Sequence, residues 1–102
     1  MKYLFIHQNY PGQFRHLAAA LAALPEHEVV AVGDERNRHP IAQPNVRLLS
    51  YPSPNGATKE THWYLHSYEA AIRRGQQVAR LCMELRKQGF APDIICVHAG
   101  WG

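Results

Sequence analysis

Four short apolar segments constrain the fold of this chain more than any other feature of its sequence. They are KYLFIH at 2–7, HEVVAVG at 27–33, VRLLSY at 46–51 and PDIICVH at 92–98. The first lacks a strict alternation of apolar and polar residues, which is typical of a strand covered on both faces in a parallel sheet. The third is the weakest and is expected near an edge of the sheet, whereas the fourth is the most apolar.

Two segments between these strands carry apolar residues at helical spacing. The first runs from Gln13 to Leu24, where Pro25 stops it, and the second runs from about His62 to Gln88. Gly89 is expected to cap the second helix at its C-terminal end. Gly75, inside that helix, weakens it by about 1 kcal/mol relative to alanine unless close packing offsets the loss.

The order strand, helix, strand, strand, helix, strand predicts an open α/β sheet with right-handed crossovers, that is, a Rossmann-like fold. The expected order of its parallel strands is 3-2-1-4, which places the first and fourth strands side by side. Their C-terminal ends, at His7 and His98, then flank the topological switch point where such sheets bind ligands. Because no helix follows the fourth strand, we expect the chain to be a fragment of a larger domain.

Composition excludes several classes of function. The chain has 102 residues, of which 46% are hydrophobic, so it is long enough for one core. Its net charge of +3 comes from 11 basic and 8 acidic residues that are scattered, which argues against a nucleic-acid or anionic-membrane surface. The opening MKYLFIH is too short for a signal-peptide core and no stretch is long enough to span a bilayer, so a cytoplasmic location is expected.

The stretch HQNYPGQFRH at 7–16 links the first strand to the first helix. A bend at Pro11, Gly12 and Gln13 brings backbone N–H groups of the first helical turn toward the strand end, and such a helix start favours anions. The alternative is an ordinary turn that needs a glycine only for its backbone angles. The three glycines of a dinucleotide fingerprint and the G-K-[ST] of a P-loop are both missing.

Histidines are the other candidates for chemistry. His7 and His98, at the ends of adjacent strands, can donate to a sugar hydroxyl or a phosphate oxygen, or transfer a proton near neutral pH; alternatively, each is bonded only to neighbouring backbone. His16 faces either the sheet or the cleft. His62 and His66 are four residues apart but have no evident third ligand, so no metal site is expected.

The stretch PGQFRHLAAALAALPEHEVVAVG resembles the first βαβ unit of family 4 glycosyltransferases of the GT-B fold. The family pattern is a glycine-rich loop, a histidine about one turn later, and then LA..L...GHEV. In this chain those places are occupied by Gly12, His16, Leu17-Ala18, Leu21 and HEVV. The C-terminal part looks like a bacterial subgroup of this family, through GQ.VAR, GF.PDII and the final H.GWG. The sequence departs from the pattern at Tyr10-Pro11-Gly12, where relatives carry two glycines, and at Pro25-Glu26, where relatives carry one.

The resemblance implies a retaining transferase that moves a sugar from a nucleotide-sugar donor to an acceptor without a metal or another cofactor. Residues 1–102 then correspond to part of the N-terminal, acceptor-side domain, which is inactive without the donor-binding domain and its paired glutamates. By position, Gly12 with Pro11 and Gln13 faces the donor diphosphate, and His98 matches a histidine that reaches the donor sugar. His7, His16 and Gly100 are further possible ligand contacts.

Two other functions stay open on the sequence alone. One is a stand-alone α/β module that binds a phosphorylated ligand or partner, and the other is a GT-B sugar-nucleotide epimerase. For a fragment of a larger domain, the fourth strand, at 93–98, is expected to have an unpaired edge that promotes self-association. Part of the apolar stripe of the long helix, between Leu65 and Leu85, is expected to be exposed.

Overall fold

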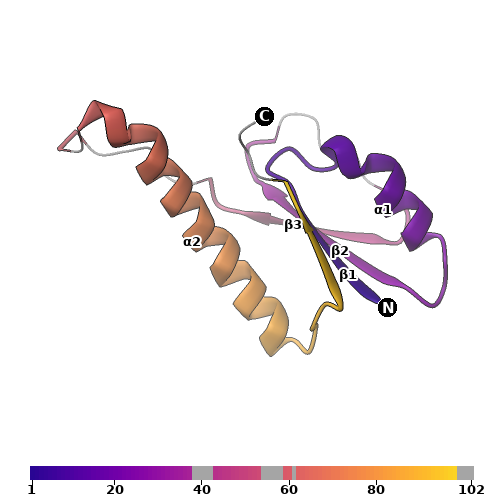
Figure 1. Ribbon diagram of the computed structural model, residues 1–102. Coiled ribbons are helices and arrows are strands. Elements are labelled where there is room, and N and C mark those ends of the chain that lie inside the picture. The colour runs from indigo at the N-terminus through magenta and orange to yellow at the C-terminus, as the bar shows by residue number, and fades with distance from the viewer. Residues whose placement is uncertain (38–42, 54–58, 61, 99–102) are drawn as a thin grey trace.

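The computed structural model describes residues 1–37, 43–53, 59–60 and 62–98. Its elements are β1 (Lys2–Ile6), a 3-10 turn η1 (Gly12–Phe14), α1 (Arg15–Ala22), β2 (Glu28–Asp34), β3 (Val46–Tyr51), a second 3-10 turn η2 (Trp63–Leu65), α2 (His66–Lys87) and β4 (Ile94–Val97). The four strands form one parallel sheet in the order β3-β2-β1-β4 (Figure 1). The predicted class, order and strand direction are therefore confirmed.

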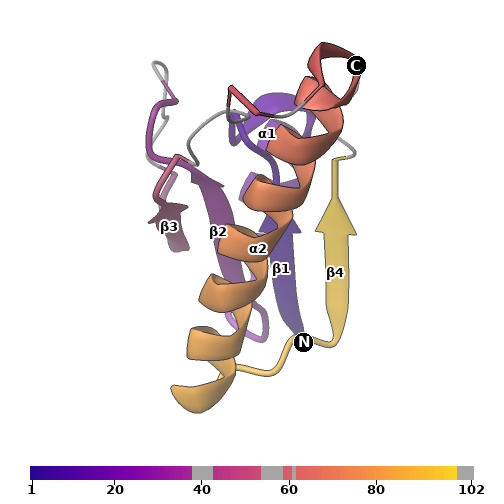
Figure 2. The same ribbon diagram turned by 90° about the vertical axis from the view of Figure 1, so that its left-hand side faces the viewer.

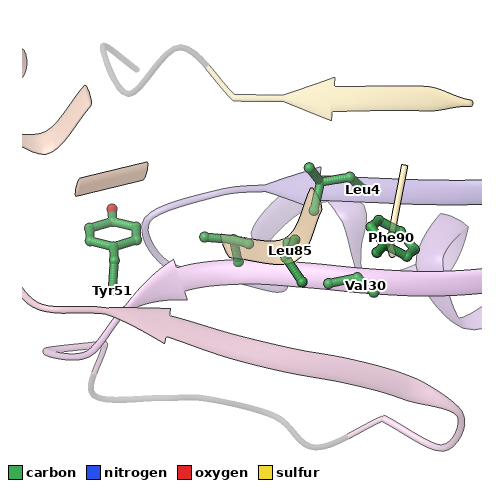
Figure 3. Packing of buried hydrophobic residues seen from close by; sticks show 6 residues of the cluster. Leu4, Val30, Tyr51, Leu85 and Phe90 are labelled. Carbon is green, nitrogen blue, oxygen red and sulfur yellow. The ribbon is translucent and has the colours of Figure 1, made fainter. Parts of the chain in front are cut away.

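The two helices lie on opposite faces of the sheet (Figures 1 and 2). Successive side chains of β1 alternate between these faces, so that Leu4 packs toward α2 and Phe5 packs toward α1. Figure 3 shows the α2 side of the core, in which Leu85 and Phe90 close over the sheet. This two-sided burial explains why the first strand lacks an alternating sequence pattern.

The α1 side of the core is built with small and aromatic residues. Ala18 and Ala22 are the buried residues of α1, and their size lets the helix approach the sheet closely. Phe14 packs against Phe5 with the ring centroids 5.2 Å apart. The first turn of the predicted 13–24 helix is the 3-10 turn η1, and the α-helix itself ends before Pro25.

The long helix α2 extends beyond the sheet. Its 22 residues span about 33 Å at 1.5 Å per residue, whereas the strands have only four to seven residues and span about 13–23 Å. Leu85 is buried, but Leu65, Tyr68 and Ile72 are exposed, as expected for part of this stripe. A Cβ on Gly75 would meet nothing within 4 Å, so packing does not offset its cost to the helix. Gly89 adopts a φ of 90° and caps the helix as predicted.

The strand β4 lies at an edge of the sheet and pairs with β1 along its described length. Ile95 is 55% exposed and Val97 is 60% exposed, although both belong to the most apolar strand. An edge of this kind presents free backbone N–H and C=O groups next to apolar side chains, which favours pairing with another chain.

We expect this chain to self-associate through β4, with two copies pairing antiparallel into a continuous sheet. Sedimentation velocity at micromolar concentration should show a dimer. Ile95→Lys should yield monomers because a charge on an edge strand opposes pairing, whereas Met83→Lys should leave the dimer intact because this equally exposed residue lies on α2. A monomeric wild-type chain would contradict the prediction.

Among the residues that the structure describes, no helix combines the length and the apolar character that crossing a membrane requires.

Candidate functional site

His7 and His98 lie together at the C-terminal ends of β1 and β4. The register pairs Ile6 with Val97, so the following residues of the two strands are neighbours. The two imidazole rings are stacked, with their centroids 4.3 Å apart and their planes 23° from parallel. The structure thus brings together two residues that only the strand order, and not their spacing in the sequence, predicted to be close.

The environment of His7 favours a neutral imidazole with a defined tautomer. Burial of the ring lowers the pKa of His7, and the nearby His98 lowers it further. The backbone N–H of Asn9 donates a hydrogen bond of 3.0 Å to Nδ1 of His7. Since Nδ1 accepts, the proton of neutral His7 is on Nε2.

Gly12 is required by its contact with His7. Its φ is +46°, and a Cβ at this position would lie 2.4 Å from Nε2 of the His7 ring. A side chain is therefore excluded twice, by the backbone conformation and by the imidazole. The sequence offered two explanations for this glycine, an ordinary turn or an anion-binding loop, and neither included the space that His7 occupies.

The loop before α1 is anchored by residues that the sequence did not single out. Tyr10 is fully buried; its hydroxyl donates to Oε1 of Gln43 at 2.7 Å, and Nε2 of Gln43 donates to the Arg15 carbonyl at 2.8 Å. The side-chain amide of Asn37 donates to the Tyr10 carbonyl at 2.7 Å. The connection between β2 and β3 thereby fixes the cis Tyr10–Pro11 segment and, with it, Gly12.

Burial raises the pKa of Tyr10 from 10.0 to about 12. The neutral phenol is thus favoured in the folded state, and this contribution to stability is complete below pH 10 and lost as the pH rises toward 12. We expect Tyr10→Phe to lower the free energy of unfolding at neutral pH by about 1 kcal/mol, because Gln43 loses its donor. Between pH 10 and about pH 12, the free energy of unfolding of this variant should fall less than that of wild type.

Urea unfolding at a series of pH values measures both effects. Tyr64→Phe is the matched control, since Tyr64 is 72% exposed and should change neither quantity. An alkaline stability profile of Tyr10→Phe identical to that of wild type would contradict this role of Tyr10. The pKa of Tyr51 is also raised, by burial first and then by Asp34, so part of the alkaline loss should persist in the variant.

A pocket of about 600 Å³ opens on the α2 side of the same strand ends. Its described lining combines residues from the strand ends with one side of α2, namely Ile6, Gln8, Tyr51, Ser67, Ala70, Ala71, Arg74, Gly75, Val78, Val97 and His98. His98 is therefore shared: it stacks on His7 and also lines the pocket. We call this space the α2 pocket.

Asp34, at the end of β2, lies next to the α2 pocket, and its carboxylate already interacts with donor groups of the protein. Its carboxylate accepts hydrogen bonds from the Arg36 backbone N–H at 2.9 Å and from the Ser53 hydroxyl at 3.3 Å. Nη2 of Arg74 lies 3.5 Å from Asp34 Oδ2. Asp34 is only 8% exposed, so it acts mainly as a structural counter-ion at this edge of the sheet.

The other predicted site residues are not gathered in one place. Pro11 is buried, Gly12 and Gln13 are exposed, and none of them is among the described residues that line the α2 pocket. His16 is exposed on α1, and Gly100 lies outside the described residues.

Metal-ligating side chains do not gather within the described part of the chain. No group of three His, Cys, Asp or Glu side chains there is placed to hold a metal ion. His62 instead accepts a hydrogen bond of 3.2 Å from the Tyr64 backbone N–H at the start of η2.

An open parallel α/β sheet with polar side chains and a pocket at the C-terminal ends of its strands is the arrangement of the Rossmann-like class, whose members bind ligands at this edge of the sheet. The sequence profile of the glycosyl transferase family 4 group matches residues 25–102, which include β2, β3, α2 and β4. The chain belongs to this family. Comparison with curated proteins and with solved structures gave no match.

Proposed function

We propose that this chain is the acceptor-side part of a retaining glycosyltransferase that transfers a sugar from a nucleotide-sugar donor to an acceptor. Family membership supports the class of reaction. The observation that carries the proposal is the stacked His7–His98 pair at the strand ends, of which His98 lines the α2 pocket. The family resemblance implies a second domain that binds the nucleotide and carries the paired glutamates. That domain would complete the active site.

In this proposal each part of the site has a different task. The α2 pocket receives the acceptor, and His98 at its border contacts the transferred sugar. The buried His7 is neutral and holds the His98 ring by stacking, so that His98 is positioned before the substrates bind. The loop at Pro11, Gly12 and Gln13 offers backbone N–H groups from Gly12 and Gln13 to the donor diphosphate.

The test is a transfer assay on the complete protein with isotopically labelled nucleotide-sugars and a panel of acceptors. We expect release of the nucleoside diphosphate, a glycosylated acceptor with the anomeric configuration of the donor, and unchanged turnover in the presence of a chelator. An epimerised nucleotide-sugar without transfer would indicate an epimerase, and binding without any turnover would indicate a binding module. Either outcome would overturn the proposal.

A further inference from the structure

Arg74 is the only arginine or lysine among the described residues that line the α2 pocket. It lies on α2 and its side chain is 37% exposed, yet its Nε is buried and has no hydrogen-bond partner within the described part of the chain. A buried donor without a partner costs about 1–3 kcal/mol, and a ligand that accepts from this guanidinium would offset part of that cost.

Neither the ion pair with Asp34 nor the hydrogen bond to the Tyr51 side chain saturates Arg74. The distance of 3.5 Å between Arg74 Nη2 and Asp34 Oδ2 is longer than the 2.7–2.9 Å, roughly, of a charge-assisted hydrogen bond. Asp34 also accepts from the Arg36 backbone and from Ser53, which divides its charge among three donors. The guanidinium, with five N–H donors in total, therefore has donors left for a ligand.

The remaining polar groups of the α2 pocket match the same kind of ligand. Three further lining residues carry side chains that can donate a hydrogen bond, namely Gln8, Ser67 and His98, and no acidic residue is among the described lining. A planar guanidinium can donate two parallel hydrogen bonds to two oxygens of one carboxylate or phosphate group. A neutral sugar hydroxyl has a single oxygen and does not accept in this way.

We infer that the α2 pocket binds an oxyanion, a phosphate or a carboxylate, that is part of the acceptor, with Arg74 as its principal ligand. This inference rests on the proposed function, which places the acceptor in the α2 pocket. The oxyanion lies at the Arg74 end and the hydroxyl to be glycosylated lies at the His98 end. The acceptor is thus a small anionic hydroxyl compound, or the anionic end of a larger one, and not a neutral sugar alone.

The binding test uses the ¹⁵N-labelled chain with inorganic phosphate in one titration and acetate in another, each against sodium chloride at equal ionic strength. The Nε–Hε resonance of Arg74 and the backbone amides of Ser67 and His98 should shift and saturate. The stronger of the two anions identifies the kind of oxyanion. Shifts that chloride reproduces, or the absence of shifts with both anions, would overturn the inference.

Three substitutions at two adjacent positions of α2 sharpen this test. Arg74→Gln should weaken anion binding at least tenfold, whereas Arg73→Gln should leave it unchanged because Arg73 pairs with Glu69 at 2.8 Å and does not line the pocket. Arg74→Lys keeps the charge near Asp34 and should bind the anion with intermediate strength, which guards against a folding defect in Arg74→Gln. Equal binding by all three variants would overturn the assignment of Arg74.

Kinetics on the complete protein separate this inference from the proposed function. Arg74→Gln should raise the acceptor KM at least tenfold and leave the donor KM unchanged. If Arg74→Gln transfers sugar as well as wild type, whichever acceptor is used, the inference is overturned and the proposed function stands. Absence of transfer in the wild type overturns the proposed function, while the anion titrations still report on the pocket.

Discussion

Replacing Gly12 with alanine should lower the free energy of unfolding by about 3 kcal/mol. A left-handed backbone costs an L-residue about 1–2 kcal/mol, and forcing a methyl group into a packed site costs about 1–3 kcal/mol more. Both terms apply because φ is +46° and the new Cβ would lie 2.4 Å from Nε2 of His7. The His7 ring cannot move away freely, since it is held by the Asn9 N–H and by the stacked His98. Denaturant unfolding measures the loss.

Substitutions at His7 and Gly75 separate the cost of the left-handed backbone from the cost of packing against His7. In a His7→Ala background the alanine at position 12 should cost only the backbone term, so a double-mutant cycle should give a coupling of about 1–3 kcal/mol between His7 and Gly12. Gly75→Ala is the control, because a Cβ there meets nothing within 4 Å. That change should stabilise the chain by up to about 1 kcal/mol. Independent effects of the His7 and Gly12 substitutions would contradict the contact.

On the proposed function, His98→Ala in the full-length protein should lower the rate of sugar transfer at least about tenfold, which corresponds to roughly 1.4 kcal/mol in the barrier. His98 borders the α2 pocket and is oriented by its stacking on His7, so its loss removes a polar contact that is positioned in advance. Initial rates at saturating donor and acceptor test the expectation. Unchanged rates would leave His98 with a structural role only.

Two controls accompany this variant. His62→Ala removes an exposed histidine that is outside the described lining of the pocket and should leave transfer within about twofold of wild type. The pKa of His7, followed by NMR, should rise in His98→Ala because His98 contributes to lowering it, yet it should stay below the ordinary value because burial is the larger cause. An unfolded variant would lose this residual shift, so lost activity and lost structure are distinguished.

Much of the architecture was predictable because it depends on patterns that are local or periodic. The apolar run at Val46–Tyr51 has the bounds of β3, and the glycine after the long helix caps it with a positive φ. Once the strand order was predicted, it also placed the ends of β1 and β4 together, so the neighbourhood of His7 and His98 required no structure. Register and chain connectivity carry this information.

The contacts that shape the site are of a different kind, and only the tertiary structure decided them. Tyr10 and Gln43 are 33 residues apart and their hydrogen bond follows no periodicity. The fit of the His7 ring against Gly12 depends on the curvature of one loop, and the meeting of Arg74 with Asp34 depends on where α2 crosses the sheet. A sequence specifies periodic burial through each residue's own chemistry, but a pairwise contact between distant segments exists only after the chain has packed.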